Sequence, residues 1–324
     1  MSTATVIGAG VAGLTTALEL HRAGLDVTVI DRADGLGPAQ CTWWAGGMLA
    51  PWCERESAED AVIELGRTAA DWWDDATGGV MRAGTLVIAP QRDRQELNRF
   101  ARRTSNFETI GEDRIAALEP DLAGRFRDAL FFAEEAHLDP RKALHALAGR
   151  LTETGVEIRF GTDTAPPADL TIDCRGLAAA DELTDLRGVK GEMLLIRTRD
   201  ITLNRPIRLL HPRHPIYIVP RADGIFMLGA TMIESADRSR ITARSMLELL
   251  GAAYALHPAF AEAEILETGV DARPAFLDNL PRVIADGARI WVNGLYRHGF
   301  LLAPATARRA AETARAQLAL ERAS

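Results

Sequence analysis

Three glycines have a spacing that can bring the backbone close to a phosphate: Gly8, Gly10 and Gly13 form the pattern Gly-x-Gly-x-x-Gly. Gly8 permits a tight turn, Gly10 has no side chain to hold a pyrophosphate away, and Gly13 lets a helix pack closely on a strand. Asp31 lies roughly 20 residues further on, where a carboxylate can bind the hydroxyls of a ribose. These four residues predict a dinucleotide site.

The sequence around the glycines supports this prediction, since glycines alone occur in many turns. Residues 4–7 have the pattern of a buried strand, residues 14–21 place apolar side chains on one helical face, and residues 26–31 form a second strand pattern. The phosphates would lie at the N-terminus of the helix, beside Val11 and Ala12. We therefore expect a strand, a phosphate-binding turn, a helix and a second strand.

The two residues at the end of the second strand each have more than one interpretation. Asp31 could bind the ribose or could be a solvated cap at a strand end. Arg32 could face the phosphate of an NADP, lie near an adenine or remain a solvated neighbour. Both residues are candidate cofactor contacts.

A second unusual segment, residues 41–51, mixes small residues with two tryptophans. Small residues let a planar ligand approach the backbone, which makes the segment a candidate to line the ring system of a cofactor. A tightly packed loop with two core aromatics explains the same composition equally well. The candidate contacts are Thr42, Ala45, Gly46, Gly47 and Met48.

Length and composition define the broad class of the protein. With 324 residues, 47% hydrophobic and 25% charged, the chain is globular in composition and long enough for two domains. A net charge of −8 offers no basic surface for nucleic acid. No apolar run approaches the roughly 18 residues of a membrane span. Too few residues precede the first strand for a signal peptide, so we expect a cytosolic protein.

The cysteines and histidines give no sign of a metal site or a disulfide framework. Cys41, Cys53 and Cys174 are odd in number and lack a Cys-x-x-Cys spacing, so we expect reduced thiols. The seven histidines are scattered along the chain, without a His-x-x-x-His pair. We expect no metal.

The order of the predicted elements indicates an α/β fold. Strands and helices alternate in the first half, whereas long strands follow from Gly188, including a hairpin that turns at Asp223-Gly224. Helices are expected over 57–77 with Ser57 as N-cap, 93–104, 140–154, 243–256 and from Pro304 to near 321. Strands are expected over 85–89, 156–160, 170–174, 189–198, 207–210, 216–220, 225–229, 264–273 ending before Pro274, and 289–294.

These elements predict a Rossmann-like dinucleotide-binding domain with an interleaved antiparallel-sheet (α+β) substrate domain. An interleaved arrangement leaves the reactive ring of the cofactor at the junction of the two domains, where a substrate would meet it. The expected boundaries are 1–77, 140–187 and 274–324 for the dinucleotide domain, and 78–139 and 188–273 for the substrate domain.

Several motifs occur in an order that resembles a known family: the glycine turn of residues 8–13, Ala-Gly-Gly-Met-Leu-Ala-Pro at 45–51, Tyr-Ile-Val-Pro-Arg at 217–221, Gly-Ala-Thr-Met at 229–232, Arg273-Pro274, and Arg-His-Gly-Phe-Leu-Leu-Ala-Pro at 297–304. Nearly end to end, the chain resembles the FAD-dependent D-amino acid oxidase superfamily, and within it the glycine oxidases of thiamine biosynthesis. It departs from that family at Asp31, where Glu is usual, and at His298, where Asn is usual.

The resemblance implies FAD as the cofactor instead of a nicotinamide, and the absence of a flavin-linkage pattern suggests that FAD is non-covalent. It also implies that Arg273 and Tyr217 bind a substrate carboxylate and that Met232 lines a small pocket. Further cofactor contacts are implied at Gly176, Arg297, His298, Gly299, Phe300 and Leu301.

Arginine suits the anchoring of a carboxylate, because its planar fork donates two parallel charged hydrogen bonds. Structural alternatives stay open for each candidate. They are an ion pair of Arg273 with Asp271 or Asp278, core packing of Tyr217 and of Met232, and a helix cap or a flavin hydrogen bond for His298.

The expected activity is the FAD-dependent oxidative deamination of glycine, sarcosine and small D-amino acids to an imine or glyoxylate, with reduction of O2 to H2O2. By analogy with the family, the imine would supply the thiazole of thiamine. The expected partners are a small amino acid and O2, without nucleic acid or membrane, and a homo-oligomer is left open. The alternatives are a D-amino acid oxidase or dehydrogenase of broader specificity, and a non-catalytic dinucleotide-binding protein.

Overall fold

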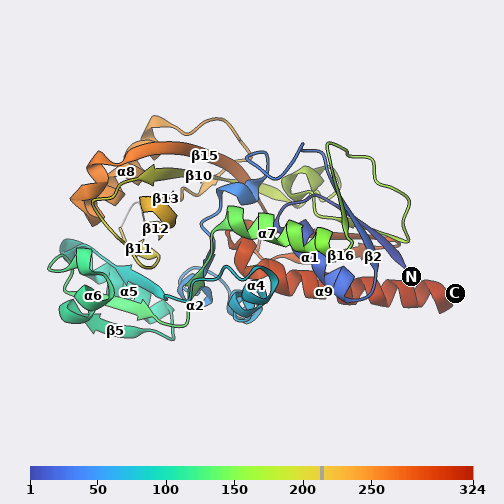
Figure 1. The fold of residues 1–324 in the computed structure, drawn as a ribbon. Coiled ribbons are helices and arrows are strands. Elements are labelled where there is room, and N and C mark those ends of the chain that lie inside the picture. Colours follow the sequence, from blue (N-terminus) through green and yellow to red (C-terminus); the bar gives the residue numbers. More distant parts are fainter. Residues whose placement is uncertain (212–214, 324) are drawn as a thin grey trace.

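Two large sheets lie side by side in the computed structural model, which describes residues 1–211 and 215–323 (Figure 1). The six-stranded sheet lies at the end of the elongated molecule that holds both termini. The nine-stranded sheet lies at the opposite end. The mixed α/β class expected from the sequence is confirmed.

The six-stranded sheet has the strand order β16-β17-β9-β1-β2-β8, with β1 (Thr3–Ile7) near its centre. β1 pairs in parallel with β2 and β9, β2 with β8, and β9 with β17. β16 runs antiparallel to β17 and was missing from the sequence prediction. The bounds are β2 (Asp26–Asp31), β8 (Glu157–Phe160), β9 (Leu170–Asp173), β16 (Arg282–Asp286) and β17 (Arg289–Asn293).

Five helices share one hydrophobic core with this sheet: α1 (Val11–Arg22), α3 (Asp60–Gly66), α4 (Ala69–Thr77), α7 (Pro140–Glu153) and α9 (Gly299–Ala323). α7 begins as predicted, with Pro140 in its first turn. The Asp139 carboxylate accepts hydrogen bonds from the main-chain N–H groups of Arg141 and Lys142, which a helix start otherwise leaves unpaired.

The nine-stranded sheet has the order β14-β10-β13-β12-β11-β4-β6-β5, with β15 paired to β10. The predicted hairpin is confirmed: Asp223 and Gly224 have φ values of 61° and 68° and join β12 to β13. The sheet is not purely antiparallel, because β11 pairs in parallel with β4. The bounds are β4 (Thr85–Ile88), β5 (Glu108–Gly111), β6 (Asp128–Phe132), β10 (Arg187–Arg197), β11 (Ile207–Leu209), β12 (Ile216–Pro220), β13 (Ile225–Gly229), β14 (Ile233–Glu234) and β15 (Glu264–Ala275).

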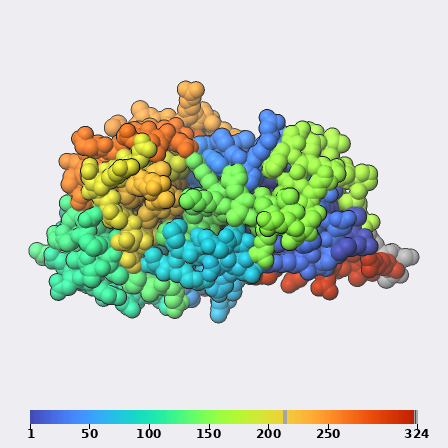
Figure 2. Space-filling model, in the orientation of Figure 1, coloured from blue at the N-terminus to red at the C-terminus, as the bar shows by residue number. Residues whose placement is uncertain are grey.

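Shorter elements cover this sheet and connect it to the other one. The antiparallel pair of β3 (Met48–Leu49) and β7 (Ala136–His137) brings together residues far apart in sequence. In Figure 2 sequence-distant segments likewise meet at the middle of the surface, since cyan, green and yellow-to-orange residues adjoin there. The remaining helices are α2 (Pro51–Glu54), α5 (Arg94–Arg103), α6 (Glu112–Leu118) and α8 (Ala243–Leu256). The domain boundaries given above stay a prediction.

The prediction that Pro304 opens the last helix was wrong. α9 begins at Gly299 and contains Pro304 in its second turn. Proline has no N–H to donate to the carbonyl four residues earlier, which is that of Phe300. The indole Nε1 of Trp73 donates to this carbonyl at 2.7 Å instead. A side chain of α4 therefore replaces the hydrogen bond that Pro304 cannot make.

Two other predicted boundaries also need correction. The single helix expected over 57–77 is divided into α3 and α4, and Ser57 is not its N-cap, because α3 begins at Asp60. β15 does not end before Pro274 but continues to Ala275. In the described residues β15 pairs with β10 alone, so it is an edge strand, where a missing N–H costs no ladder hydrogen bond.

Candidate active site

The N-terminus of α1 opens onto a cleft. Gly10 is the N-cap of α1, and no side chain caps it. The first main-chain N–H bonded inside the helix is that of Leu14, to the carbonyl of Gly10. The N–H groups of the first turn are therefore available to an anion in the cleft, as the sequence predicts.

Gly10 leaves room for a ligand. A Cβ at this position would meet only the Thr42 side chain, whose Oγ1 would lie 3.6 Å away. The Thr42 hydroxyl is buried and has no hydrogen-bond partner in the described residues. An open space, free N–H groups and an unpaired buried hydroxyl together fit the phosphate or sugar of a dinucleotide.

Gly8 and Gly13 have a different role from Gly10. Gly8 has a φ of 105°, and a Cβ there would lie 2.7 Å from the carbonyl oxygen of Cys174 on the neighbouring strand end. A Cβ on Gly13 would overlap the carbonyl of Gly8. These two glycines make the close packing of strand and helix possible, which is the role the motif assigns to them.

Asp31 lies beside the glycine turn. Its carboxylate accepts hydrogen bonds from the main-chain N–H of Ala9 at 2.7 Å and of Ala33 at 2.8 Å, and from the Gln40 amide at 3.3 Å. These contacts fix the carboxylate at the rim of the cleft. Arg32 lies next to it. The predicted residues that line this cleft are Gly8, Gly10, Val11, Ala12, Asp31, Arg32, Thr42, Gly176 and Gly299.

A second cavity adjoins the cleft. Thr42 and Gly299 line both of them, so the two spaces meet at these residues. The cavity is lined by the remaining predicted contacts, namely Ala45, Gly46, Gly47, Met48, Arg297, His298, Phe300 and Leu301, and by the predicted substrate residues Tyr217, Met232 and Arg273. The structure thus brings together segments that are far apart in sequence.

Arg273 lies on β15 and faces this cavity. Its Nη1 donates to the carbonyl of Thr231 at 3.1 Å. A Cβ on Gly191 of the adjacent strand β10 would overlap the guanidinium, so the glycine provides the space in which the guanidinium lies. The sequence analysis missed Gly191, although a glycine inside a strand pattern is a signal of close approach.

The structural alternative for Arg273 is not realised. Asp271 pairs with Arg238 at 2.6 Å, and Asp278 pairs with Arg282 at 3.3 Å. Within residues 1–211 and 215–323, no carboxylate lies at ion-pair distance from Arg273. A guanidinium without a counter-ion in a cavity is the arrangement expected of an anion site.

Tyr217 lies on β12 beside the same cavity. A Cβ on Gly229 of β13 would lie 3.1 Å from the Tyr217 hydroxyl, and a Cβ on Gly46 would lie 2.9 Å from its ring. Burial raises the pKa of Tyr217. The phenol therefore keeps its proton at neutral pH and can donate a hydrogen bond to a carboxylate.

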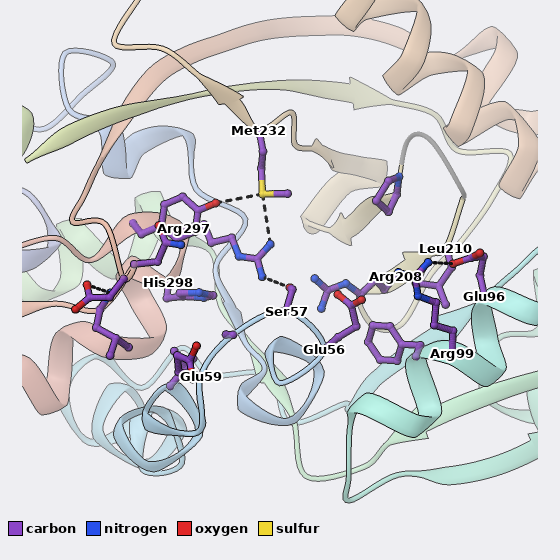
Figure 3. Close-up of a pocket in the computed structure, with 18 of the residues that line it drawn as sticks. Glu56, Ser57, Glu59, Glu96, Arg99, Arg208, Leu210, Met232, Arg297 and His298 are labelled. Carbon is purple, nitrogen blue, oxygen red and sulfur yellow. Dashed lines mark hydrogen bonds and ion pairs between the residues drawn. The ribbon is translucent and has the colours of Figure 1, made fainter.

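Met232 and Arg297 lie at the mouth of the cavity. Met232 is 54% exposed, and its Sδ accepts hydrogen bonds of 3.4 Å from the Tyr296 hydroxyl and from Arg297 Nη1. Arg297 also donates through Nη2 to Ser57 at 2.7 Å (Figure 3). Its side chain thus spans the mouth from Met232 to the segment after α2.

Glu54 and Arg208 are functional candidates that the sequence analysis missed. Glu54 Oε2 lies 2.7 Å from Arg297 Nη2, and Glu54 Oε1 lies 3.3 Å from Arg208 Nη1. Burial alone would raise the pKa of Glu54, but Arg297 and Arg208 outweigh it and hold the pKa at about 2. Neither residue belongs to a motif, so no local pattern could have identified them.

His298 faces the same carboxylate. Its Nδ1 lies 3.5 Å from Glu54 Oε2, and burial lowers its pKa to about 4. The imidazole is therefore neutral at physiological pH. Of the two roles weighed from the sequence, a helix cap or a flavin hydrogen bond, neither accounts for this contact with Glu54.

The three cysteines are free thiols. Burial raises the pKa of Cys41, which lines the cavity, to about 12, so its thiol is not a nucleophile at neutral pH. Among the described residues, no group of three His, Cys, Asp or Glu side chains has the arrangement of a metal site. No helix in the same residues is long and apolar enough to span a membrane.

Comparison with known proteins identifies the class. Residues 3–313 match the model of the family described as FAD dependent oxidoreductase. The chain is 60% identical over 305 residues to a protein of Rhizobium etli that carries the name thiamine biosynthesis oxidoreductase ThiO, which covers 93% of each chain. It is 27% identical over 341 residues to the glycine oxidase of Pseudomonas aeruginosa, covering 94% of this chain and 92% of that one.

A solved structure supports the same fold. The glycine oxidase of Bacillus cereus superposes with a TM-score of 0.82 over 98% of this chain and 96% of that one, at 21% identity. The chain belongs to the FAD-dependent oxidoreductase family that includes D-amino acid oxidase. Within that family its relatives are of the ThiO and glycine oxidase type, and the resemblance drawn from the motifs is confirmed. The cofactor is FAD, and the alternative of a non-catalytic dinucleotide-binding protein is excluded.

Proposed function

We propose that this protein oxidises glycine, and with lower efficiency sarcosine and small D-amino acids, to the corresponding imine with reduction of O2 to H2O2. The observation that carries the proposal is Arg273, a guanidinium without a carboxylate partner in the part of the chain that the structure describes, beside the protonated Tyr217 hydroxyl in one cavity. A small amino acid presents one carboxylate, and these two donors suit it.

The cleft fits FAD, and we propose that Gly10, Thr42 and the N-terminus of α1 hold its phosphates and sugar without a covalent bond. Bound there, FAD would supply the acceptor for the hydride from the substrate Cα and the reductant for O2. Glycine loses two electrons and two protons, O2 gains both to become H2O2, and water converts the imine to glyoxylate and ammonia.

The residues of the chain orient the substrate. Arg273 and Tyr217 fix the carboxylate, which leaves a limited set of directions in which the Cα–H bond can lie. Met232 lies at the mouth and restricts the volume on the other side of Cα. A flexible methionine discriminates one methylene by only about 1 to 3 kcal/mol, so we expect a graded preference among small amines.

The cellular role that we propose is supply of the imine for the thiazole of thiamine. It is supported by the name of the Rhizobium etli relative. It is also supported by the bifunctional protein ThiO/ThiG of Trichormus variabilis, to which the chain is 29% identical over 51% of that protein's length. This role rests on similarity, since the site itself ends with release of the imine.

The test of the activity is the stoichiometry of products from purified, yellow protein. With glycine in air, we expect one H2O2 for each glyoxylate. A flavin that glycine reduces and that then stays reduced in air would instead make the protein a dehydrogenase, which passes its electrons to another acceptor.

A further inference from the structure

The cavity holds more arginines than one substrate carboxylate needs. Three arginines line it: Arg208 from β11, Arg273 from β15 and Arg297 from the turn before α9. Arg273 alone lacks a carboxylate partner among the described residues. Arg208 and Arg297 share Glu54 of α2, at 3.3 Å and 2.7 Å.

Glu54 lies mostly buried beside two guanidiniums and remains ionised. Its side chain is 14% exposed, and those of Arg208 and Arg297 are 12% and 18% exposed. The two guanidiniums keep the pKa of Glu54 at about 2, despite burial that would raise it. A permanent negative charge therefore lies beside the two arginines across the physiological pH range.

Space for a larger substrate is present next to these arginines. An outer cavity of about 380 Å³ adjoins the inner one, and Arg208, Met232 and Arg297 line both. Figure 3 shows the Arg297 side chain between Met232 and Ser57, with Arg208 on the other side of Ser57. Volume alone would thus admit a substrate with a second carboxylate.

We propose that Glu54 restricts the site to substrates with a single carboxylate. It occupies the guanidiniums of Arg208 and Arg297, which would otherwise bind a second carboxylate, and its own charge repels one placed there. The inference rests on the proposed function, because it assumes that Arg273 binds the first carboxylate. Glu54 is thus a specificity residue that need not touch glycine.

The experiment compares two secondary amines that differ in one carboxylate: sarcosine (N-methylglycine) and iminodiacetate (N-carboxymethylglycine). For the wild-type holoenzyme we expect kcat/KM for sarcosine to exceed that for iminodiacetate by roughly 100-fold or more. Glu54→Gln keeps the shape of the side chain and removes its charge. It should reduce the sarcosine-to-iminodiacetate ratio of kcat/KM by about tenfold or more, mainly by lowering KM for iminodiacetate. Glu64→Gln, which breaks a surface pair with Arg67 on α3, is the matched control and should leave the ratio unchanged.

If Glu54→Gln gains activity with iminodiacetate because it frees Arg297, that gain should depend on Arg297. A merely structural effect of Glu54→Gln would not depend on it. Adding Arg297→Gln to Glu54→Gln should abolish the new activity with iminodiacetate. An unchanged ratio in Glu54→Gln with full flavin content would overturn the proposal.

A binding measurement covers the case in which Glu54→Gln does not fold. We expect the flavin absorbance of the wild-type holoenzyme to report acetate binding about tenfold tighter than malonate binding. Equal or tighter binding of malonate would overturn the role of Glu54. If neither glycine nor sarcosine reduces the flavin, the proposed function fails, and the acetate and malonate comparison still tests Glu54 on its own.

Discussion

We propose that the cleft at α1 and the cavity at β15 both receive anions, and that they do so by opposite means. In the cleft the donors are main-chain N–H groups of one continuous segment, and the critical feature is the missing side chain of Gly10. In the cavity the donors are side chains, Arg273 and Tyr217, from strands more than fifty residues apart in sequence.

This difference predicts different sensitivities to mutation. A side chain added at Gly10 should prevent cofactor binding in the cleft. Loss of the Arg273 charge should prevent substrate binding in the cavity, because the substrate carboxylate would be buried without its charged partner. Cofactor content and substrate turnover should therefore respond to separate sets of substitutions.

Arg273→Leu should have the largest effect. The substrate carboxylate would lose its charge partner, at a cost of roughly 2 to 5 kcal/mol or about two to four decades in kcat/KM for glycine. Flavin content should not change, because Arg273 does not line the cleft. Arg244→Leu, on the exposed face of α8, serves as the control. A fall of less than tenfold would mean that Arg221 or Arg297 holds the carboxylate.

Gly10→Val should give folded protein that is largely free of flavin. The side chain would occupy the phosphate space, yet among the described residues its Cβ meets only Thr42 within 4 Å, so the fold should survive. The ratio of flavin to protein absorbance measures the effect, and circular dichroism checks the fold. Gly149→Val on α7, where a Cβ meets nothing within 4 Å, should retain full flavin. A complete flavin spectrum in Gly10→Val would refute the assignment of this turn.

Acid should destabilise the cavity through His298. Its pKa is 6.5 in the unfolded chain and about 4 in the fold, so protonation favours the unfolded state. Stability that is fully present above pH 6.5 should be lost as the pH falls to 4, by about 3 kcal/mol at 1.36 kcal/mol for each pKa unit. Denaturant titrations at several pH values measure this loss. His298→Gln should show a shallower loss over that window, and an equal slope in the two proteins would contradict the burial of a neutral imidazole.

Trp73→Phe should have the smallest effect, confined to the dinucleotide side. It leaves the buried Phe300 carbonyl without a donor, since Pro304 has no N–H, at a cost of about 1 to 3 kcal/mol. Urea unfolding would measure the loss. Trp72→Phe is the matched control, because its indole donates to Glu19 near the surface and should cost less. Equal losses in the two variants would show that the Phe300 carbonyl needs no donor.

The two regions also differ in how far their sequence predicts them. The strand, turn and helix of the cleft could be predicted because they are local and each glycine has a geometric reason, whereas the ligand contacts there stay predictions. In the cavity the motifs pointed to Arg273, Tyr217 and Met232, which the structure brings to one space. The role proposed for Glu54 depends on the approach of α2 to β11, which no local pattern encodes. The two wrong predictions at prolines also depended on contacts between segments distant in sequence. Pro304 lies inside α9, where Trp73 of α4 donates the hydrogen bond that the proline cannot make. β15 continues past Pro274 because it is an edge strand.

The most direct test of the central claim is a peroxide assay of the wild-type holoenzyme with glycine, sarcosine, D-alanine, D-proline and a bulky D-amino acid. If Arg273 and Tyr217 anchor one carboxylate and Met232 restricts the space beyond Cα, kcat/KM should be highest for glycine and fall gradually over sarcosine and D-alanine, with the bulky substrate last. Bulky D-amino acids that exceed glycine in kcat/KM would contradict this account and make the protein a general D-amino acid oxidase.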